Sequence, residues 1–244
     1  YTDNVVGTII GQGMNNILPA KIGEVVKAYY LARESGQTVA WLIGLVFWER
    51  FFDLNLLLLL GLAIVLSVSS PLSMGAFGLL VLGVWLSLLV IRRWPQIARS
   101  LAVRLPVQRV REFSLELIEH LVVGLNLTVV LVSAFWSVLI WLQYVGQVAL
   151  VLILVAGLEL DLTAVLVIFV VSGVGMNLAG SPGGLGVYEA AIVLSAGWFG
   201  VGQEQALAAA IVLHVIQYMP STVLGLLLMS RFNVSYKQVR KPAS

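Results

Sequence analysis

The sequence predicts an all-α membrane protein, a polytopic helix bundle that contains two broken, re-entrant hairpins. Of its 244 residues, 60% are hydrophobic and only 11% are charged, and the mean hydropathy is +1.00. A soluble globular domain carries about 25% charged residues, so this composition is that of a membrane protein. Hydrophobic runs continue along the whole chain, and we therefore expect one transmembrane domain over residues 1–244.

The rarer residue types limit the chemistry. The chain has no cysteine, which excludes disulfides and thiolate metal sites, and its only histidines are His120 and His214. We expect no metal and no cofactor. The net charge of +2 is too small to suggest a nucleic-acid partner. The chain opens on Tyr-Thr-Asp without an initiator Met, and we expect one or more helices to precede it.

Apolar segments of two lengths divide the chain. A membrane-spanning helix needs about 20 mainly apolar residues. Segments of that length lie at about 40–68, 73–91, 128–157 and 205–230. Shorter apolar segments lie near 4–18, 163–179 and 186–199, with Gly and Pro between or after them. This second pattern favours re-entrant half-helices.

The basic residues predict the orientation of the chain. Residues 92–111 hold six arginines and no acidic residue, and no Lys or Arg occurs between Glu112 and Ser230. The arginines are Arg92, Arg93, Arg99, Arg104, Arg109 and Arg111, and the C-terminal tail adds Arg231, Lys237, Arg240 and Lys241. By the positive-inside rule, we expect the loop and the C-terminus to be cytoplasmic. We also expect the protein to lie in the plasma (inner) membrane.

The segment 109–122 has apolar side chains at a spacing of three and four residues, opposite charged ones. The apolar residues are Val110, Phe113, Leu117 and Leu121. The pattern indicates either an amphipathic helix at the cytoplasmic surface or an ordinary connecting helix. The basic loop and this helix together cover about 92–125.

Two stretches of the sequence resemble each other. Each begins Gly-Met-Asn, at Gly13 and Gly175, and continues through Pro and Gly to a glutamate that opens an apolar helix, Glu24 and Glu189. Within the next long span, Arg50 follows the first glutamate by 26 residues, and a histidine follows the second by 25.

The helices that follow these stretches enter the membrane from opposite sides, which is typical of the inverted repeats of transporters. We expect a first repeat at about 4–68 and a second at about 163–230. In such folds the broken helices meet near the middle of the bilayer.

Three ionisable residues, Glu49, Arg50 and Asp53, lie near the middle of the predicted helix 40–68. Such a residue at the centre of a membrane helix costs about 2.5–3.5 kcal/mol, so it is a functional candidate. Arg50 can reach Asp53 at i,i+3. The triad either neutralises itself and fixes helix packing, or leaves Arg50 to bind an anion such as phosphate in a polar cavity.

The first motif adds Asn16, Lys21, Glu24 and Lys27. Glu24 and Lys27 share one helix face, with Lys21 in the preceding turn. On a cytoplasmic helix these charges would be a solvated face. In a re-entrant hairpin they would form a cationic floor for a lipid headgroup.

The second motif runs Ser181-Pro182-Gly183-Gly184-Leu185-Gly186 and precedes a helix. We expect this turn to free several backbone N–H groups that can hold an anion, unless its glycines serve only close helix packing. In the last span, His214, Gln217 and Tyr218 form a polar stripe before Pro220, which should kink the helix. The histidine is either a packing residue or a proton relay.

These motifs resemble the lysylphosphatidylglycerol synthase transmembrane (flippase-like) family. The resemblance covers nearly the whole chain and is carried by Asn16-x-x-Pro19-x-Lys21-x-Gly23-Glu24, Glu49-Arg50-x-x-Asp53 and Ser181-Pro182-Gly183-Gly184-Leu185-Gly186-x-x-Glu189. It implies a membrane bundle that moves polar lipids, aminoacylated or polyprenyl-linked, between leaflets. In the family's multidomain members a soluble aminoacyltransferase domain fused C-terminally makes the lipid. That domain has no counterpart here, so the resemblance does not assign lipid synthesis to this chain.

Three positions depart from the family pattern. Members usually have Arg where Lys21, Lys27 and His214 stand. Lysine keeps the charge but lacks the bidentate grip on phosphate, and histidine can be neutral at pH 7.

We therefore expect a lipid flippase or transporter, without catalytic residues, whose partners are membrane lipids and a lipid-modifying enzyme. The expected substrate-binding residues are Asn16, Lys21, Glu24, Lys27, Glu49, Arg50, Asp53, Asn177, Ser181, Gly183, Gly184, Gly186, Glu189, His214 and Gln217. Two alternatives stay open. The first is a membrane transferase or hydrolase acting on a lipid-linked substrate, because paired carboxylates and a histidine can do acid–base chemistry. The second is a scaffold for a partner enzyme.

Overall fold

The computed structural model describes residues 2–18, 21–68, 78–79, 81–86, 89–90, 93–123, 127–178 and 181–232. Of the predicted span 73–91, residues 73–77, 80, 87, 88 and 91 lie outside the described residues. So do Pro19, Arg92 and the C-terminal Lys237, Arg240 and Lys241.

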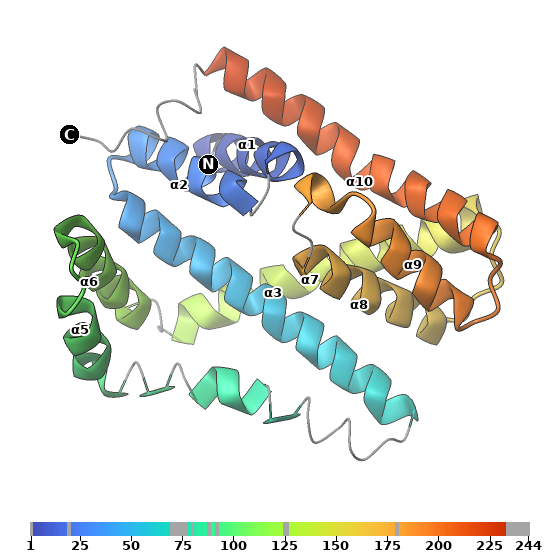
Figure 1. Cartoon of the computed structure of the whole chain (residues 1–244), viewed down its shortest axis with the longest axis horizontal. Coiled ribbons are helices and arrows are strands. Elements are labelled where there is room, and N and C mark those ends of the chain that lie inside the picture. Colours follow the sequence, from blue (N-terminus) through green and yellow to red (C-terminus); the bar gives the residue numbers. More distant parts are fainter. Residues whose placement is uncertain are drawn as a thin grey trace. The chain divides into compact units, whose positions relative to one another are not determined.

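The described residues form helices and no strand, which confirms the predicted all-α class. Figure 1 shows their order along the chain. The helices are α1 (Thr2–Ile17), α2 (Ile22–Ser35), α3 (Val39–Val68), α5 (Pro95–Val103), α6 (Gln108–Val123), α7 (Leu127–Ala149), the π-helical η2 (Leu150–Val155), α8 (Leu162–Leu178), the 3-10 turn η3 (Pro182–Gly184), α9 (Val187–Gly197) and α10 (Gln203–Arg231).

Three predicted long helices are confirmed as α3, α7 with η2, and α10. Among the described residues, Leu131–Val155 and Gln203–Arg231 are long and apolar enough to cross a membrane. Helix α3 is similarly long, with 30 residues, but it carries Glu49, Arg50 and Asp53 in its first half.

The chain divides into two compact units. The first contains Tyr1–Gly36 and Leu142–Ser244, and the second contains Gln37–Trp141, so helix α7 continues from the second into the first. The predicted second repeat lies wholly in the first unit, whereas the predicted first repeat is divided between the two. The repeat boundaries and the inverted relation stay predictions.

Glycines bring the helices of the first unit close together. A Cβ on Gly23 of α2 would lie 2.0 Å from the carbonyl oxygen of Gly11 in α1. On the other side of α1, a Cβ on Gly225 of α10 would lie 2.9 Å from the Cα of Gly13. Since real Cβ atoms do not approach backbone this closely, both crossings require glycine.

Each of the two motifs lies at a break between helices, where the short half-helices were predicted. Helix α1 ends before Lys21, which is left-handed with φ 53° and ψ 34° and precedes α2. Helix α8 ends before η3, where Gly183, Gly184 and Gly186 all have positive φ, and α9 follows. The flanking helices have 16, 14 and 30 residues in the first case and 17, 11 and 29 in the second.

In the second unit, aromatic side chains of α3 form a core cluster of Trp48, Phe51 and Phe52. The predicted amphipathic segment is helix α6, and it packs along the first turns of α3. There, Trp41 stacks on His120 with ring centroids 5.2 Å apart. Part of α6 is therefore covered by protein.

Candidate functional site

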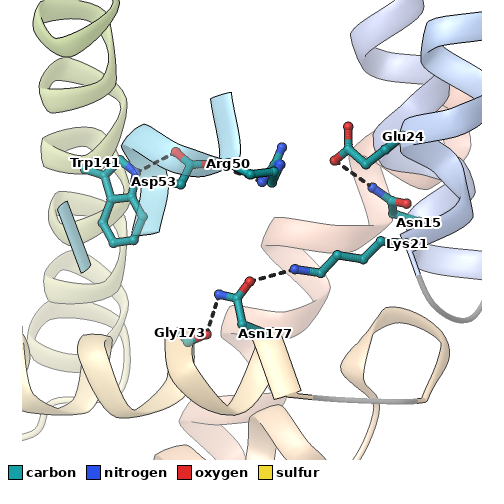
Figure 2. Close-up of polar contacts among 8 residues, drawn as sticks. All are labelled: Asn15, Lys21, Glu24, Arg50, Asp53, Trp141, Gly173 and Asn177. Atoms are coloured by element: carbon teal, nitrogen blue, oxygen red, sulfur yellow. Dashed lines mark hydrogen bonds and ion pairs between the residues drawn. The ribbon is translucent and has the colours of Figure 1, made fainter. Parts of the chain in front are cut away.

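The two motifs meet within the first unit. Lys21 Nζ donates to Asn177 Oδ1 at 2.6 Å, and Asn177 Nδ2 donates to the carbonyl of Gly173 at 2.9 Å, as Figure 2 shows. A Cβ on Gly183 would lie 3.1 Å from the carbonyl oxygen of Asn16. Residues more than 150 positions apart in the sequence thus form one polar junction, which we call the hairpin junction.

Backbone geometry directs the Lys21 side chain. A left-handed φ is uncommon for a residue other than glycine, and it places this lysine outside the helical course of α2. The residue is exposed and its ammonium group extends from the chain break to α8. The junction therefore presents a positive charge, held by a neutral amide, at an accessible position.

The other charges of the first motif lie on α2. Asn15 Nδ2 donates to Glu24 Oε1 at 3.3 Å, which links α1 to α2 (Figure 2). Lys27 is only 8% exposed, and a Cβ on Gly11 would lie 2.9 Å from its Cβ. Its alkyl stem therefore packs in the crossing of α1 and α2, and it is not part of a solvated face.

Glu189 joins the second motif to α10. Its Oε1 lies 2.5 Å from His214 Nδ1, and its Oε2 accepts the backbone N–H of Gly186 at 2.8 Å. The two side chains are only 15% and 9% exposed, and the ring of Tyr218 lies 4.3 Å from that of His214. We call this set the Glu189 clasp, because one carboxylate fixes both the turn before α9 and the face of α10.

The expectation that the Gly-rich turn frees its backbone N–H groups is wrong for three of them. Gly184 and Leu185 donate to the carbonyls of Ser181 and Pro182 at 3.0 and 3.3 Å, and Gly186 donates to Glu189. The 3-10 turn and the clasp satisfy these donors internally. The hydroxyl of Ser181 likewise donates to the carbonyl of Leu185, at 3.1 Å.

The polar stripe of α10 is also engaged by other helices. Tyr188 of α9 donates its hydroxyl to Gln217 Oε1 at 3.0 Å, and the Tyr218 hydroxyl lies 2.9 Å from Met176 Sδ of α8. These contacts hold α10 against the hairpin of α8 and α9. These side-chain contacts support the interpretation that the stripe serves helix packing.

Asn16 of α1 also forms hydrogen bonds to α10. Its Nδ2 lies within hydrogen-bond distance of three acceptors that flank Pro220. They are the carbonyl of Tyr218 at 3.2 Å, Ser221 Oγ at 3.0 Å and Thr222 Oγ1 at 2.8 Å. This amide therefore links α1 to α10 on both sides of Pro220, the position where proline interrupts the helical hydrogen-bond ladder.

The predicted triad on α3 belongs to the second unit. Arg50 Nη1 pairs with Asp53 Oδ2 at 2.9 Å, which confirms the expected i,i+3 pair. Trp141 Nε1 donates to Asp53 Oδ1 at 3.0 Å, as Figure 2 shows, so both carboxylate oxygens are engaged. The Arg50 side chain is still 48% exposed, and Glu49 is exposed as well.

Sequence reasoning missed two polar contacts of α3. One is Trp141, which lies 88 residues from Asp53 and shows no pattern that marks it. The other is Asn55, which is 6% exposed, donates to the carbonyl of Phe51 at 2.7 Å and accepts from Trp85 Nε1 at 2.8 Å. An asparagine in a membrane span is a detectable signal.

In the part of the chain that the structure describes, no group of three His, Asp or Glu side chains is placed to hold a metal ion. Helices of this apolarity, with ionic groups between them, define an integral membrane protein.

The family model "Lysylphosphatidylglycerol synthase TM region" matches residues 3–225, and the chain belongs to that family. This confirms the resemblance carried by the motifs. Searches of curated proteins and of solved structures found no match.

Proposed function

We propose that this protein is a lipid flippase or lipid transporter that moves a phosphate-containing polar lipid between leaflets. The acyl tails would remain in the bilayer while the headgroup passes along polar groups of the protein. The observation that carries the proposal is the hairpin junction, where the ammonium group of Lys21 is held only 2.6 Å from the neutral amide oxygen of Asn177.

A lipid phosphate is a better partner for this ammonium group than an amide is. The ammonium group already makes a charge-assisted hydrogen bond to Asn177, but a phosphate oxygen adds the attraction of a full negative charge, so a phosphate would replace Asn177 as the acceptor. The Asn177 amide nitrogen donates one N–H to Gly173 and would donate its other N–H to a phosphate oxygen. The junction therefore suits a headgroup that binds and leaves again.

In the second unit, we assign Arg50 the same task. Asp53 fixes one edge of its guanidinium group and Trp141 fixes Asp53, so the charge is positioned while nearly half of the side chain is accessible. Glu49 and Glu24 would balance an amine on the headgroup. We assign Asn16, Gln217 and the Glu189 clasp to holding the hairpins, because their polar atoms are engaged within the protein.

We also propose in which membrane the protein lies and which of its segments face the cytoplasm. The arginines of 93–111 favour a cytoplasmic position for α5 and the start of α6. This corresponds to the plasma (inner) membrane with a cytoplasmic C-terminus. A lipid-modifying enzyme on that side would supply or consume the transported lipid.

The test is a leaflet-accessibility assay in proteoliposomes with headgroup-labelled phosphatidylglycerol. We expect Lys21→Gln and Arg50→Gln each to slow translocation at least tenfold at equal protein incorporation. The matched control is Arg33→Gln, because Arg33 is exposed on α2 and pairs with its neighbour Glu34. Wild-type rates in both site variants would refute the proposal.

One observation favours the alternative of a membrane transferase or hydrolase. A carboxylate that holds a buried imidazole, as in the Glu189 clasp, is the arrangement of a general base with its orienting group. Incubation of the purified chain with a radiolabelled lipid-linked substrate tests it. A new labelled product that is lost in His214→Ala would support this alternative, and an unchanged lipid would exclude it for that substrate.

A further inference from the structure

We propose that α5 and the residues just before it form a second lipid site, which binds one anionic phospholipid without transporting it. The site lies within the second unit and does not depend on the proposed function. Its parts are an apolar groove, an arginine with a tryptophan at one end of the groove, and the exposed face of α5.

The groove is lined by Leu86, Leu89, Val90, Arg93 and Trp94 and has a volume of about 550 Å³. Among the described residues of this lining, Arg93 alone is charged. The volume is in the usual range for a small-molecule site, and the wall suits an acyl chain more than a polar ligand.

The face of α5 next to the groove is apolar and uncovered. Trp94, Ile97 and Leu101 follow one another at helical spacing, and their side chains are 51%, 55% and 61% exposed. Another side of α5 packs on α6, where Arg99 pairs with Glu119 at 3.5 Å. A helix covered on one side and apolar on another, with arginines beside it, is typical of a helix that lies in the membrane interface.

The charges at both ends of α5 select the lipid. Arg93 lies before the helix, with its guanidinium carbon 6.0 Å from the centre of the Trp94 ring, and Arg104 is at its C-cap. In the described part of the chain neither arginine pairs with a carboxylate, and residues 93–111 contain no acidic residue. A phosphate without a balancing amine complements this surface better than a zwitterionic headgroup does.

The occupant is therefore an anionic phospholipid of the leaflet that contains α5. One acyl chain would lie along Leu86, Leu89 and Val90. The guanidinium of Arg93 would bind the phosphate through two parallel hydrogen bonds, with Trp94 at the level of the headgroups.

The chain has no cysteine, which allows a probe to be placed at this site alone. A Ser100→Cys variant of the full chain would carry a fluorescent label on α5, in nanodiscs that contain phosphatidylcholine and 30% phosphatidylglycerol. In one sample the phosphatidylglycerol is brominated and quenches the label, and in the other an equal amount of phosphatidylcholine is brominated. We expect stronger quenching by phosphatidylglycerol.

Replacing Arg93 with Gln should lower this preference about fivefold, because one arginine near an anionic surface contributes about that factor. Arg33→Gln and Lys21→Gln should leave it unchanged, which separates this site from the hairpin junction. An independent variant, Leu101→Ser, should reduce quenching by both lipids, since it removes apolar contact. Equal quenching by the two lipids, or an unchanged preference in Arg93→Gln, would overturn the proposal.

Discussion

Replacing Glu189 with Ala tests whether the clasp stabilises the first unit. The change removes the partner of His214 and the acceptor of the Gly186 N–H together. It also leaves an imidazole that is only 9% exposed without its hydrogen bond. Substitutions that break a buried hydrogen-bond network in this way are among those that lower the free energy of unfolding most.

The expected magnitude follows from burial. A hydrogen bond to a charged group contributes about 1.5–3 kcal/mol, and an ordinary hydrogen bond contributes about 1 kcal/mol. The clasp is nearly but not fully buried, and Gly186 is exposed, so we expect a loss of about 3 kcal/mol. For a chain of this size, that corresponds to a fall in Tm of about 6–12 °C.

The measurement is thermal unfolding of the purified protein in detergent. Glu189→Gln should lose only about 1 kcal/mol, since its amide can still accept from Gly186 and donate to the imidazole. The control is Glu204→Ala at the exposed start of α10, where we expect about 0.5 kcal/mol from the helix dipole. If Glu189→Ala unfolds at the temperature of this control, the clasp has no structural role.

Three further substitutions test other contacts of the fold. Gly23→Ala should prevent the α1–α2 crossing and abolish a monodisperse peak in gel filtration, whereas Gly146→Ala, with open space around it, should elute like wild type. Asn16→Asp replaces the Nδ2 group, which donates to α10 beside Pro220, with an oxygen that cannot donate. It should lower the free energy of unfolding by about 1–3 kcal/mol in a denaturant titration. Trp141→Phe should free one oxygen of Asp53 and lower Tm by about 2–4 °C, and an unchanged Tm would mean that this hydrogen bond is not maintained.

The helices and their breaks could be predicted from local patterns. Apolar length located α3 and α10, and the Gly-Pro interruptions located the ends of α1 and α8, because these signals act within a few residues. The i,i+3 pair of Arg50 and Asp53 was predictable for the same reason.

The partners of the site residues were not predictable in this way. Glu189 and His214 are separated by 25 residues, and Lys21 and Asn177 by 156, so only the packed fold brings them together. The Gly-rich turn shows the same limit. Its sequence indicates exposed donors, but the carboxylate three residues beyond Gly186 folds back to accept one of them.

The glycine crossings of α1 limit how the first unit can move. Helix α1 touches the backbone of α2 at Gly23 and that of α10 at Gly225, and backbone contacts of this kind cannot yield as flexible side chains do. These crossings therefore oppose movement of the three helices against one another. The connections between helices, such as those at Gly36 and Gly200, have positive φ angles that already interrupt the helical course, and they are suited to act as hinges.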